Sequence, residues 1–203
     1  MSRTLVIDTA TAACSVALFD GDRLLAEIHE DVGRGHAERL MPMIASLPDG
    51  GRAERLLVDC GPGSFTGVRV GLAAARALAF GWNSPVLGYS SMAVIAAAAD
   101  SIAPALSVAI IGGHGELFVQ AYCCEPLRPT SELASLPPAE AARAMTAQHV
   151  FGSAAEKLVE ARGYGIAHPC LPRAADALRL GDLATLPASP IYGRAADAKP
   201  AAA

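Results

Sequence analysis

The stretch from Gly61 to Gly71, Gly-Pro-Gly-Ser-Phe-Thr-Gly-Val-Arg-Val-Gly, is the richest candidate for chemistry in this chain. Glycine-rich turns let backbone N–H groups point at an anion, and a following helix N-terminus adds the positive end of its dipole. The spacing misses the P-loop and the dinucleotide fingerprint, because Thr66 stands where both have glycine. It also misses the nucleophile elbow, because Pro62 stands where that motif has glycine. Anion binding and a tight strand-to-helix turn therefore both remain open for residues 61–67, called the glycine loop below.

A second candidate is Asp8, which ends a strand-like segment and is followed by Thr9, Ala10 and Thr11. A carboxylate followed by hydroxyls at a hairpin can hold a metal-bound water beside a phosphate. A lone aspartate at a strand end can also simply cap a turn. The candidate nucleotide or anion site consists of Asp8, Thr9, Gly61, Gly63, Ser64 and Thr66.

The rest of the chain is poor in catalytic residue types. No two of its five histidines have the i, i+4 spacing of a helical metal site, and its five cysteines contain no C-x-x-C. A serine triad cannot be proposed from spacing, because its members are neighbours in space and not in sequence. We therefore expect no catalytic residue, no metal site and no disulfide framework.

Small residues recur every four positions after the glycine loop, at Gly67, Gly71 and Ala75. Such a stripe lets another helix approach closely, and that helix can belong to this chain or to another. Arg69 and Arg76 share a second face of the same helix. With the apolar positions of the helix expected at residues 36–47, these residues form a candidate partner interface: Leu40, Met43, Ile44, Gly67, Arg69, Gly71, Ala75 and Arg76.

Hydrophobic periodicity and turn residues predict three strands at the start of the chain, then alternating helices and strands. This order favours a mixed α/β sheet with helices on its faces. The expected strands are 4–8, 14–20, 24–29, 56–59 and 85–87, and the expected helices are 36–47, 68–82 and one ending at residue 100.

The pattern restarts after Pro104, which predicts a second, smaller lobe. We expect an N-terminal lobe at 1–103, a C-terminal lobe at 104–194 and a disordered tail at 195–203. The second lobe is expected to hold strands 106–111, 116–122, 149–151 and 168–171, helices 139–146, 153–162 and 174–184, and a loop at 123–138.

Composition excludes several classes of protein. The longest apolar run, Met92–Ala99, has eight residues, whereas a membrane-spanning helix needs about 20. No signal peptide opens the sequence, so a cytoplasmic location is expected. The formal net charge of −4 argues against a stand-alone nucleic-acid binder.

Residues 61–71 resemble the signature of the bacterial TsaB (YeaZ) proteins, and so does the opening Leu5–Leu18, Leu-Val-Ile-Asp-Thr-Ala-Thr-Ala-Ala-Cys-Ser-Val-Ala-Leu. Residues 85–99, 115–118 and the closing Pro190-Ile-Tyr-Gly-Arg194 resemble the same family in place. The resemblance implies the actin-like ATPase (ASKHA) architecture of two ribonuclease-H-like lobes.

The resemblance also implies a role. TsaB-type proteins pair with the paralogue TsaD, which transfers a threonylcarbamoyl group to the adenosine next to the tRNA anticodon, and with a small ATPase, TsaE. We would then expect tRNA to be reached only through the complex, a homodimer when the partner is absent, and no tightly bound cofactor, with ATP or ADP a candidate ligand at the partner interface.

In TsaD-like proteins a helix opening with His-x-x-x-His binds the metal, and these two positions match Ser91 and Ile95 here. Isoleucine cannot coordinate a metal, so the expectation is a non-catalytic subunit. The second-lobe hairpin, Ile111–Glu116, lacks the Asp and Arg usual in the family. An independent hydrolase, either a peptidase or an ATPase, is the alternative that the glycine loop and Asp8 leave open.

Overall fold

The computed structural model describes residues 2–99 and 102–193 and contains two mixed sheets. The first sheet has the order β12-β5-β4-β1-β2-β3, with β2 antiparallel to both β1 and β3, and with β1, β4 and β5 parallel. The carboxyl ends of β1, β4 and β5 therefore meet at one edge. The strands are β1 (Arg3–Asp8), β2 (Ala13–Asp20), β3 (Arg23–Asp31), β4 (Arg55–Asp59), β5 (Val86–Tyr89) and β12 (Leu186–Pro187).

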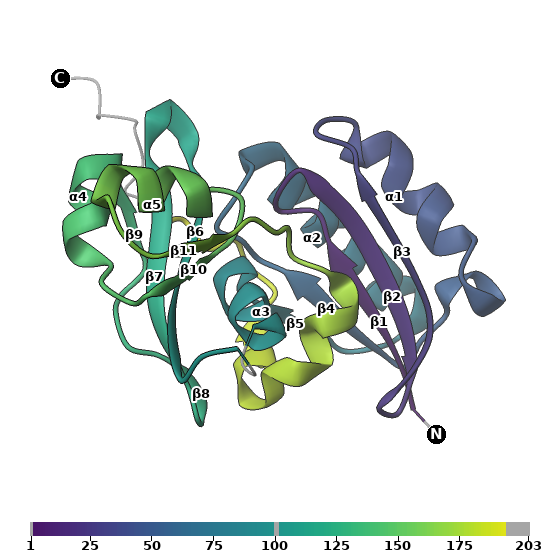
Figure 1. Ribbon diagram of the computed structural model, residues 1–203. Helices are drawn as coiled ribbons and strands as arrows, with labels where there is room; N and C mark the ends of the chain where they lie inside the picture. The colour runs from purple at the N-terminus through teal and green to yellow at the C-terminus, as the bar shows by residue number, and fades with distance from the viewer. Residues whose placement is uncertain (1, 100–101, 194–203) are drawn as a thin grey trace, which may run out of the picture.

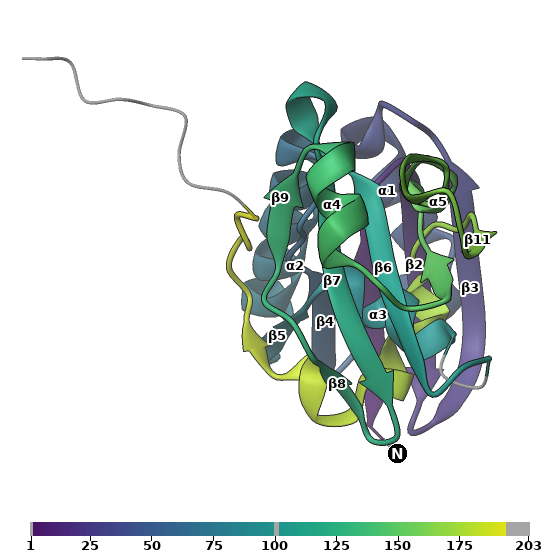
Figure 2. The ribbon, with the colours of Figure 1, turned by 60° about the vertical axis from the view of Figure 1, so that its left-hand side comes forward.

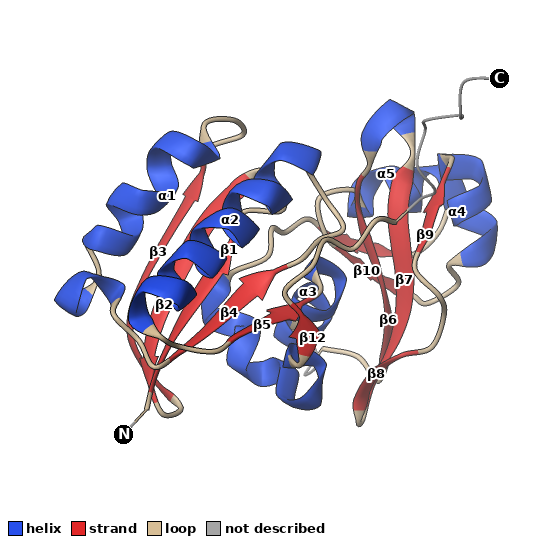
Figure 3. Ribbon diagram, turned by 180° about the vertical axis from the view of Figure 1, so that it is seen from behind, coloured by secondary structure: helices blue, strands red, loops and turns tan. Residues whose placement is uncertain are grey.

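Two helices, α1 (His36–Ala45) and α2 (Phe65–Trp82), lie side by side on one face of this sheet (Figure 3). The Ser64 side chain caps α2 by accepting a hydrogen bond from the Gly67 N–H, and Asn83 ends the helix in the left-handed region. The apolar stripe of each helix packs into one core with β1, β2 and β4. The short turn η1 (Pro48–Gly51) follows α1.

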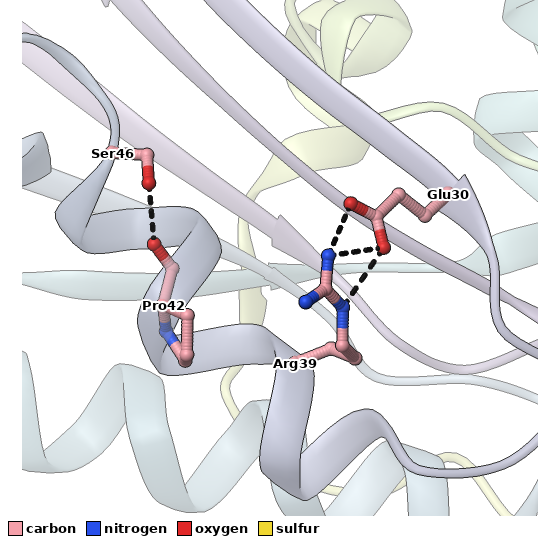
Figure 4. A network of polar contacts seen from close by, with 4 residues as sticks. All are labelled: Glu30, Arg39, Pro42 and Ser46. Atoms are coloured by element: carbon pink, nitrogen blue, oxygen red, sulfur yellow. Dashed lines mark hydrogen bonds and ion pairs between the residues drawn. The ribbon is translucent and has the colours of Figure 1, made fainter.

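An ion pair fixes α1 to the edge of the sheet (Figure 4). The Arg39 guanidinium donates to both carboxylate oxygens of Glu30 on β3, at 2.5 to 2.9 Å. Pro42 lies inside α1, where it lacks a backbone N–H. Its carbonyl accepts from both the backbone N–H and the hydroxyl of Ser46, at 3.1 and 2.9 Å.

The second sheet has the order β11-β10-β6-β7-β8, and β9 pairs with β7. In both sheets the first strand lies between the second strand, which is antiparallel to it, and a later strand that is parallel to it, β4 in the first sheet and β10 in the second. This shared order confirms the predicted fold class, an actin-like arrangement of two ribonuclease-H-like lobes. The strands are β6 (Ala105–Ile111), β7 (Leu117–Cys124), β8 (Leu127–Pro129), β9 (Ala134–Leu136), β10 (His149–Phe151) and β11 (Ile166–His168); η2 (Gly113–Gly115) links β6 and β7.

Helix α3 (Ser91–Ala98) and the 3-10 segment η3 (Ala174–Ala184) lie between the two sheets, whereas α4 (Pro138–Ala144) and α5 (Ala155–Arg162) cover the outer face of the second sheet (Figures 1 and 2). Seven of the eight residues of α3 are buried, because both sheets pack against it. None of the helices in residues 2–99 and 102–193 is long and apolar enough to cross a membrane.

The structure corrects several predicted elements. The short strands β8 and β9 lie in the interval predicted as a loop, and strand 168–171 lies instead at Ile166–His168. The segment predicted as helix 174–184 is a 3-10 run that Gly181 interrupts, with φ 52° and ψ −123°. The chain after this segment returns to the first sheet through β12, a strand of two residues that is too short to be predicted from sequence. The predicted disordered tail, 195–203, lies outside the described residues, and the proposed lobe boundary stays a prediction.

Candidate functional site

Most of the polar groups of the glycine loop are bonded to the chain itself. The Gly61 N–H donates to Asp59 Oδ1 at 2.7 Å, and the Ser64 N–H donates to the Ala10 carbonyl at 2.6 Å. The Gly67 N–H donates to Ser64 Oγ at 3.2 Å. The loop is thus fastened to the turn after β1, and these three N–H groups are not available to an anion.

The glycines are needed because α2 lies against the turn after β1. A Cβ at Gly63 would lie 2.0 Å from the Ala10 carbonyl oxygen, and one at Gly67 would lie 2.1 Å from that of Thr9. A Cβ at Gly71 would lie 2.4 Å from Thr9 Oγ1. These distances favour the tight strand-to-helix turn over the anion cradle as the reason for the glycines.

Two carboxyl groups, Asp8 and Asp59, end the neighbouring strands β1 and β4, and they are 0% and 1% exposed. Asp59 accepts from the Gly61 N–H and from the Ser91 hydroxyl, which lies 2.8 and 2.7 Å from its two oxygens. Asp8 Oδ2 accepts a hydrogen bond from the Tyr89 hydroxyl at 3.1 Å.

Burial and the neighbouring charge of Asp59 raise the pKa of Asp8 well above its usual range. Burial also raises the pKa of Asp59, to about 6, but the hydrogen bonds from Ser91 and Gly61 oppose that rise. Burial therefore favours the neutral form of both carboxyl groups, and the hydrogen bonds from Ser91 and Gly61 keep Asp59 the more acidic of the two.

The structure argues against the ligand-binding role expected of Asp8 and Thr9. Both side chains are buried, and the Thr9 hydroxyl donates to the Gly67 carbonyl at 2.7 Å. Thr9 ties the turn after β1 to α2, and Asp8 ties β1 to β5 through Tyr89, so neither side chain is open to a ligand. Ser64 and Thr66 remain exposed at the start of α2, so an anion at those two hydroxyls stays a prediction.

No group of three histidine, cysteine or acidic side chains able to hold a metal occurs in the described part of the chain. At the two positions matched to metal-binding histidines, Ser91 donates to Asp59 and Ile95 is buried in the core between the sheets. Neither side chain has a free ligand atom pointing into a cleft.

The structure corrects the candidate partner interface. The small-residue stripe packs inward against β1 and its turn, so the neighbour of that stripe is this chain itself. A partner cannot reach side chains that are enclosed in the core. The residues withdrawn from the interface are Leu40, Met43, Ile44, Gly67, Gly71 and Ala75.

The exposed sides of α1 and α2 also carry apolar side chains, beside the charged Glu38, Arg39 and Arg76. Phe80 is 91% exposed and Met41 is 46% exposed. The sequence could have indicated this exposed side of α2. Ala73 and Ala77 lie four residues apart, on a side of the helix that is offset from the buried stripe. The outer helix face is defined here as Met41 and Ala45 of α1 with Ala73, Ala77 and Phe80 of α2.

Arg69 and Arg76 contact residues 185–193, the closing segment, which crosses the carboxyl ends of β4 and β5. Arg76 Nη2 donates to the Ala188 carbonyl at 2.5 Å, and Arg69 Nη2 donates to the Tyr192 hydroxyl at 3.0 Å. The Ile191 N–H donates to the Cys60 carbonyl at 2.8 Å. The closing segment therefore covers the glycine loop from the side opposite to Ala10.

A cavity of about 270 Å³ lies between α3, β7 and η3. Its lining is mainly apolar and contains Asp182 but no basic residue. The Tyr122 hydroxyl donates to Gln120 Oε1 at 2.8 Å, so these polar groups satisfy each other. The cavity offers no positive charge to a phosphate, and ATP or ADP at a partner interface stays a prediction.

Comparisons with known proteins give a consistent assignment. The family model described as tRNA N6-adenosine threonylcarbamoyltransferase (TsaD) matches residues 27–129. The tRNA threonylcarbamoyladenosine biosynthesis protein TsaB of Haemophilus influenzae is 42% identical over 110 residues, which are 51% of this chain and 46% of the relative. TsaB of Escherichia coli is 38% identical over 130 residues, which are 59% of this chain and 54% of the relative.

The structure of YeaZ from Pseudomonas aeruginosa superimposes with a TM-score of 0.80 and 31% identity, over 95% of this chain and 100% of that one. The chain spans about half the length of the two curated relatives that it matches in sequence. The structural match extends over both sheets. This chain belongs to the TsaB/YeaZ family.

Proposed function

We propose that this chain is a non-catalytic partner subunit in tRNA threonylcarbamoyladenosine biosynthesis. It binds a TsaD-type transferase and thereby enables transfer to tRNA, while a TsaE-type ATPase acts on the same complex. Family membership supports the pathway, and the buried Ile95 supports the absence of a metal-dependent centre. The observation that carries the binding role is the exposed, apolar outer helix face.

Two adjacent helices with a flat apolar surface fit a second helix pair, because helix pairs bury such surfaces against each other in four-helix contacts. Ala73 and Ala77 allow a close approach, and Phe80 supplies a large side chain of the kind that dominates interface energetics. The bidentate pair between Arg39 and Glu30 holds α1 in place before a partner arrives (Figure 4).

The experiment is reconstitution with a TsaD-type protein, with binding and threonylcarbamoyl transfer measured separately. Phe80→Ala should weaken binding by tenfold or more, because truncating an interface hot spot costs about 2 kcal/mol or more. The control is Ile111→Ala, which truncates a side chain that is 64% exposed at the end of β6, away from both helices. Equal binding by the native chain and Phe80→Ala would refute the assigned face.

The outer helix face can also pair with a second copy of this chain, because one apolar face can serve either pairing. Sedimentation of the isolated protein should then show a dimer that Phe80→Ala weakens. Addition of the transferase should displace this dimer. A dimer that is unaffected by Phe80→Ala would assign self-association to another surface.

The independent hydrolase finds no support at the site. Asp8, on which that alternative depends, is fully buried and accepts a hydrogen bond from Tyr89. We therefore expect the purified chain to show no metal-dependent peptidase or ATPase turnover. Turnover that disappears in Asp8→Asn, with the fold retained, would reverse this assignment.

A further inference from the structure

Two sequence motifs that lie about 120 residues apart meet at the start of α2. The Arg69 guanidinium lies over the Phe65 ring, with Cζ 3.2 Å from the ring centroid, and 5.7 Å from the centroid of the Tyr192 ring. Its Nη1 donates to the Phe65 carbonyl at 3.1 Å and its Nη2 to the Tyr192 hydroxyl at 3.0 Å. The guanidinium is thus held between two aromatic rings, an arrangement called the stacking cluster below.

The stacking cluster is open to solvent. Phe65 is 69% exposed and Tyr192 is 63% exposed, so most of each ring remains uncovered although Arg69 is fixed between them. In the fold, neither ring contributes to any of the three buried clusters. Two exposed aromatic rings and a positioned guanidinium are more than fastening the closing segment requires.

Two arginines, Arg69 and Arg76, bond to the closing segment beside the cluster, although the chain as a whole carries −4. Residues 60–99 and 183–193 contain no aspartate or glutamate, but they include Arg69 and Arg76. Within the described residues, no carboxylate forms an ion pair with either arginine. The two guanidinium groups therefore offer positive charge to a polyanion.

We propose that the stacking cluster binds an unpaired segment of RNA, with a nucleobase on the open face of Phe65 or Tyr192 and a phosphate at Arg69. Aromatic rings and arginine planes stack unpaired bases, and a phosphate takes the guanidinium N–H groups that remain free. The inference rests on the proposed function, since it makes this chain contribute a direct contact to the tRNA of the complex. An acidic protein segment would contact the Arg69 charge but would not stack on the Phe65 and Tyr192 rings.

The stacking cluster and the outer helix face are separate. Phe65 and Phe80 lie 15 positions apart on α2, which corresponds to about 22 Å along the helix. Within the described part of the chain, no arginine lies over the Phe80 ring. Phe80→Ala is therefore a matched control for Phe65→Ala, since both remove one exposed phenylalanine from the same helix.

The test uses the full chain and a fluorescently labelled, unstructured RNA of about 12 nucleotides, with binding followed by anisotropy at low salt. Phe65→Ala should weaken binding by about tenfold, while Phe80→Ala leaves it unchanged. Arg69→Gln should weaken binding and lower the slope of log K against log salt by about 1. Thermal unfolding of each variant checks that the fold is retained.

The proposal is overturned if the native chain shows no RNA binding at millimolar protein, if Phe65→Ala binds like the native chain, or if polyglutamate competes as well as unlabelled RNA. The last outcome would assign the cluster to an acidic protein segment. RNA binding by a chain that fails to activate the transferase would leave this site standing and refute the proposed function instead. Transferase activation by a chain that does not bind RNA would support the proposed function and refute this RNA site.

Discussion

Replacing Gly67 by alanine tests whether the glycines serve internal packing. The added Cβ would lie 2.1 Å from the Thr9 carbonyl oxygen, a backbone atom that no rotamer change can move. The turn after β1 must shift by roughly 1 Å, and such overpacking costs about 1–3 kcal/mol. The buried hydrogen bond from Thr9 Oγ1 to the Gly67 carbonyl, at 2.7 Å, would be strained as well, at about 1 kcal/mol.

Alanine is a better helix former than glycine by about 1 kcal/mol, which offsets part of this cost. The expected net loss for Gly67→Ala is therefore about 1–3 kcal/mol in the free energy of unfolding. Gly81→Ala is the matched control, because Gly81 lies on the same helix and its Cβ would meet nothing within 4 Å. That variant should gain up to about 1 kcal/mol.

The assay is urea denaturation of the isolated chain, with the m-value checked for constancy. Gly71→Ala provides an intermediate case, because its Cβ would meet the Thr9 hydroxyl, a side-chain atom. The expected order of stability is Gly81→Ala, native, Gly71→Ala, Gly67→Ala. If Gly67→Ala were as stable as Gly81→Ala and only lost partner binding, the stripe would be an interface and the packing argument would be wrong.

Two further predictions concern the buried polar groups beside the glycine loop. Thr9→Val keeps the side-chain shape but removes the hydroxyl that donates to the Gly67 carbonyl, so urea denaturation should show a loss of about 1 kcal/mol; no loss would mean that this hydrogen bond is not formed. Because the pKa of Asp8 is higher in the folded chain than in the unfolded one, the native chain should lose stability as pH rises from about 4. Asp8→Asn should resist that loss, while Asp59→Ala should be destabilised at every pH by losing the acceptor for the Gly61 N–H; parallel stability curves for Asp8→Asn and the native chain would refute the raised pKa of Asp8.

The alternating elements of the first lobe could be predicted from sequence because each carries its own local signal. The three opening strands are separated by turn residues, and α2 follows a serine cap. β8, β9 and β12 could not be predicted this way. Each of these strands has only two or three residues, which is too short for a hydrophobic periodicity to be recognised. Each is stabilised by its pairing with β7 or β5.

The candidate site shows the same division. Spacing alone identified the small-residue stripe at Gly67 and Gly71 but could not say which neighbour it contacts, because a close approach inside the chain needs the same residues as one between chains. Asp59 was missed because an aspartate at a strand end carries no sign of a carboxyl partner on a neighbouring strand. The contact between Arg69 and Tyr192 needs the closing segment to return to the first sheet.

The glycine signature thus has a structural role and an indirect functional one. Gly63 and Gly67 bring the start of α2 against the turn after β1. Asp59 holds the glycine loop in place by accepting a hydrogen bond from the Gly61 N–H. This leaves the outer side of α2 free, with Phe65 at one end and Phe80 at the other. A substitution that loosens the glycine loop should therefore reduce partner binding and RNA binding together, whereas Phe65→Ala and Phe80→Ala should separate them. Loss of both activities in either phenylalanine variant, with the fold intact, would show that α2 presents one surface and not two.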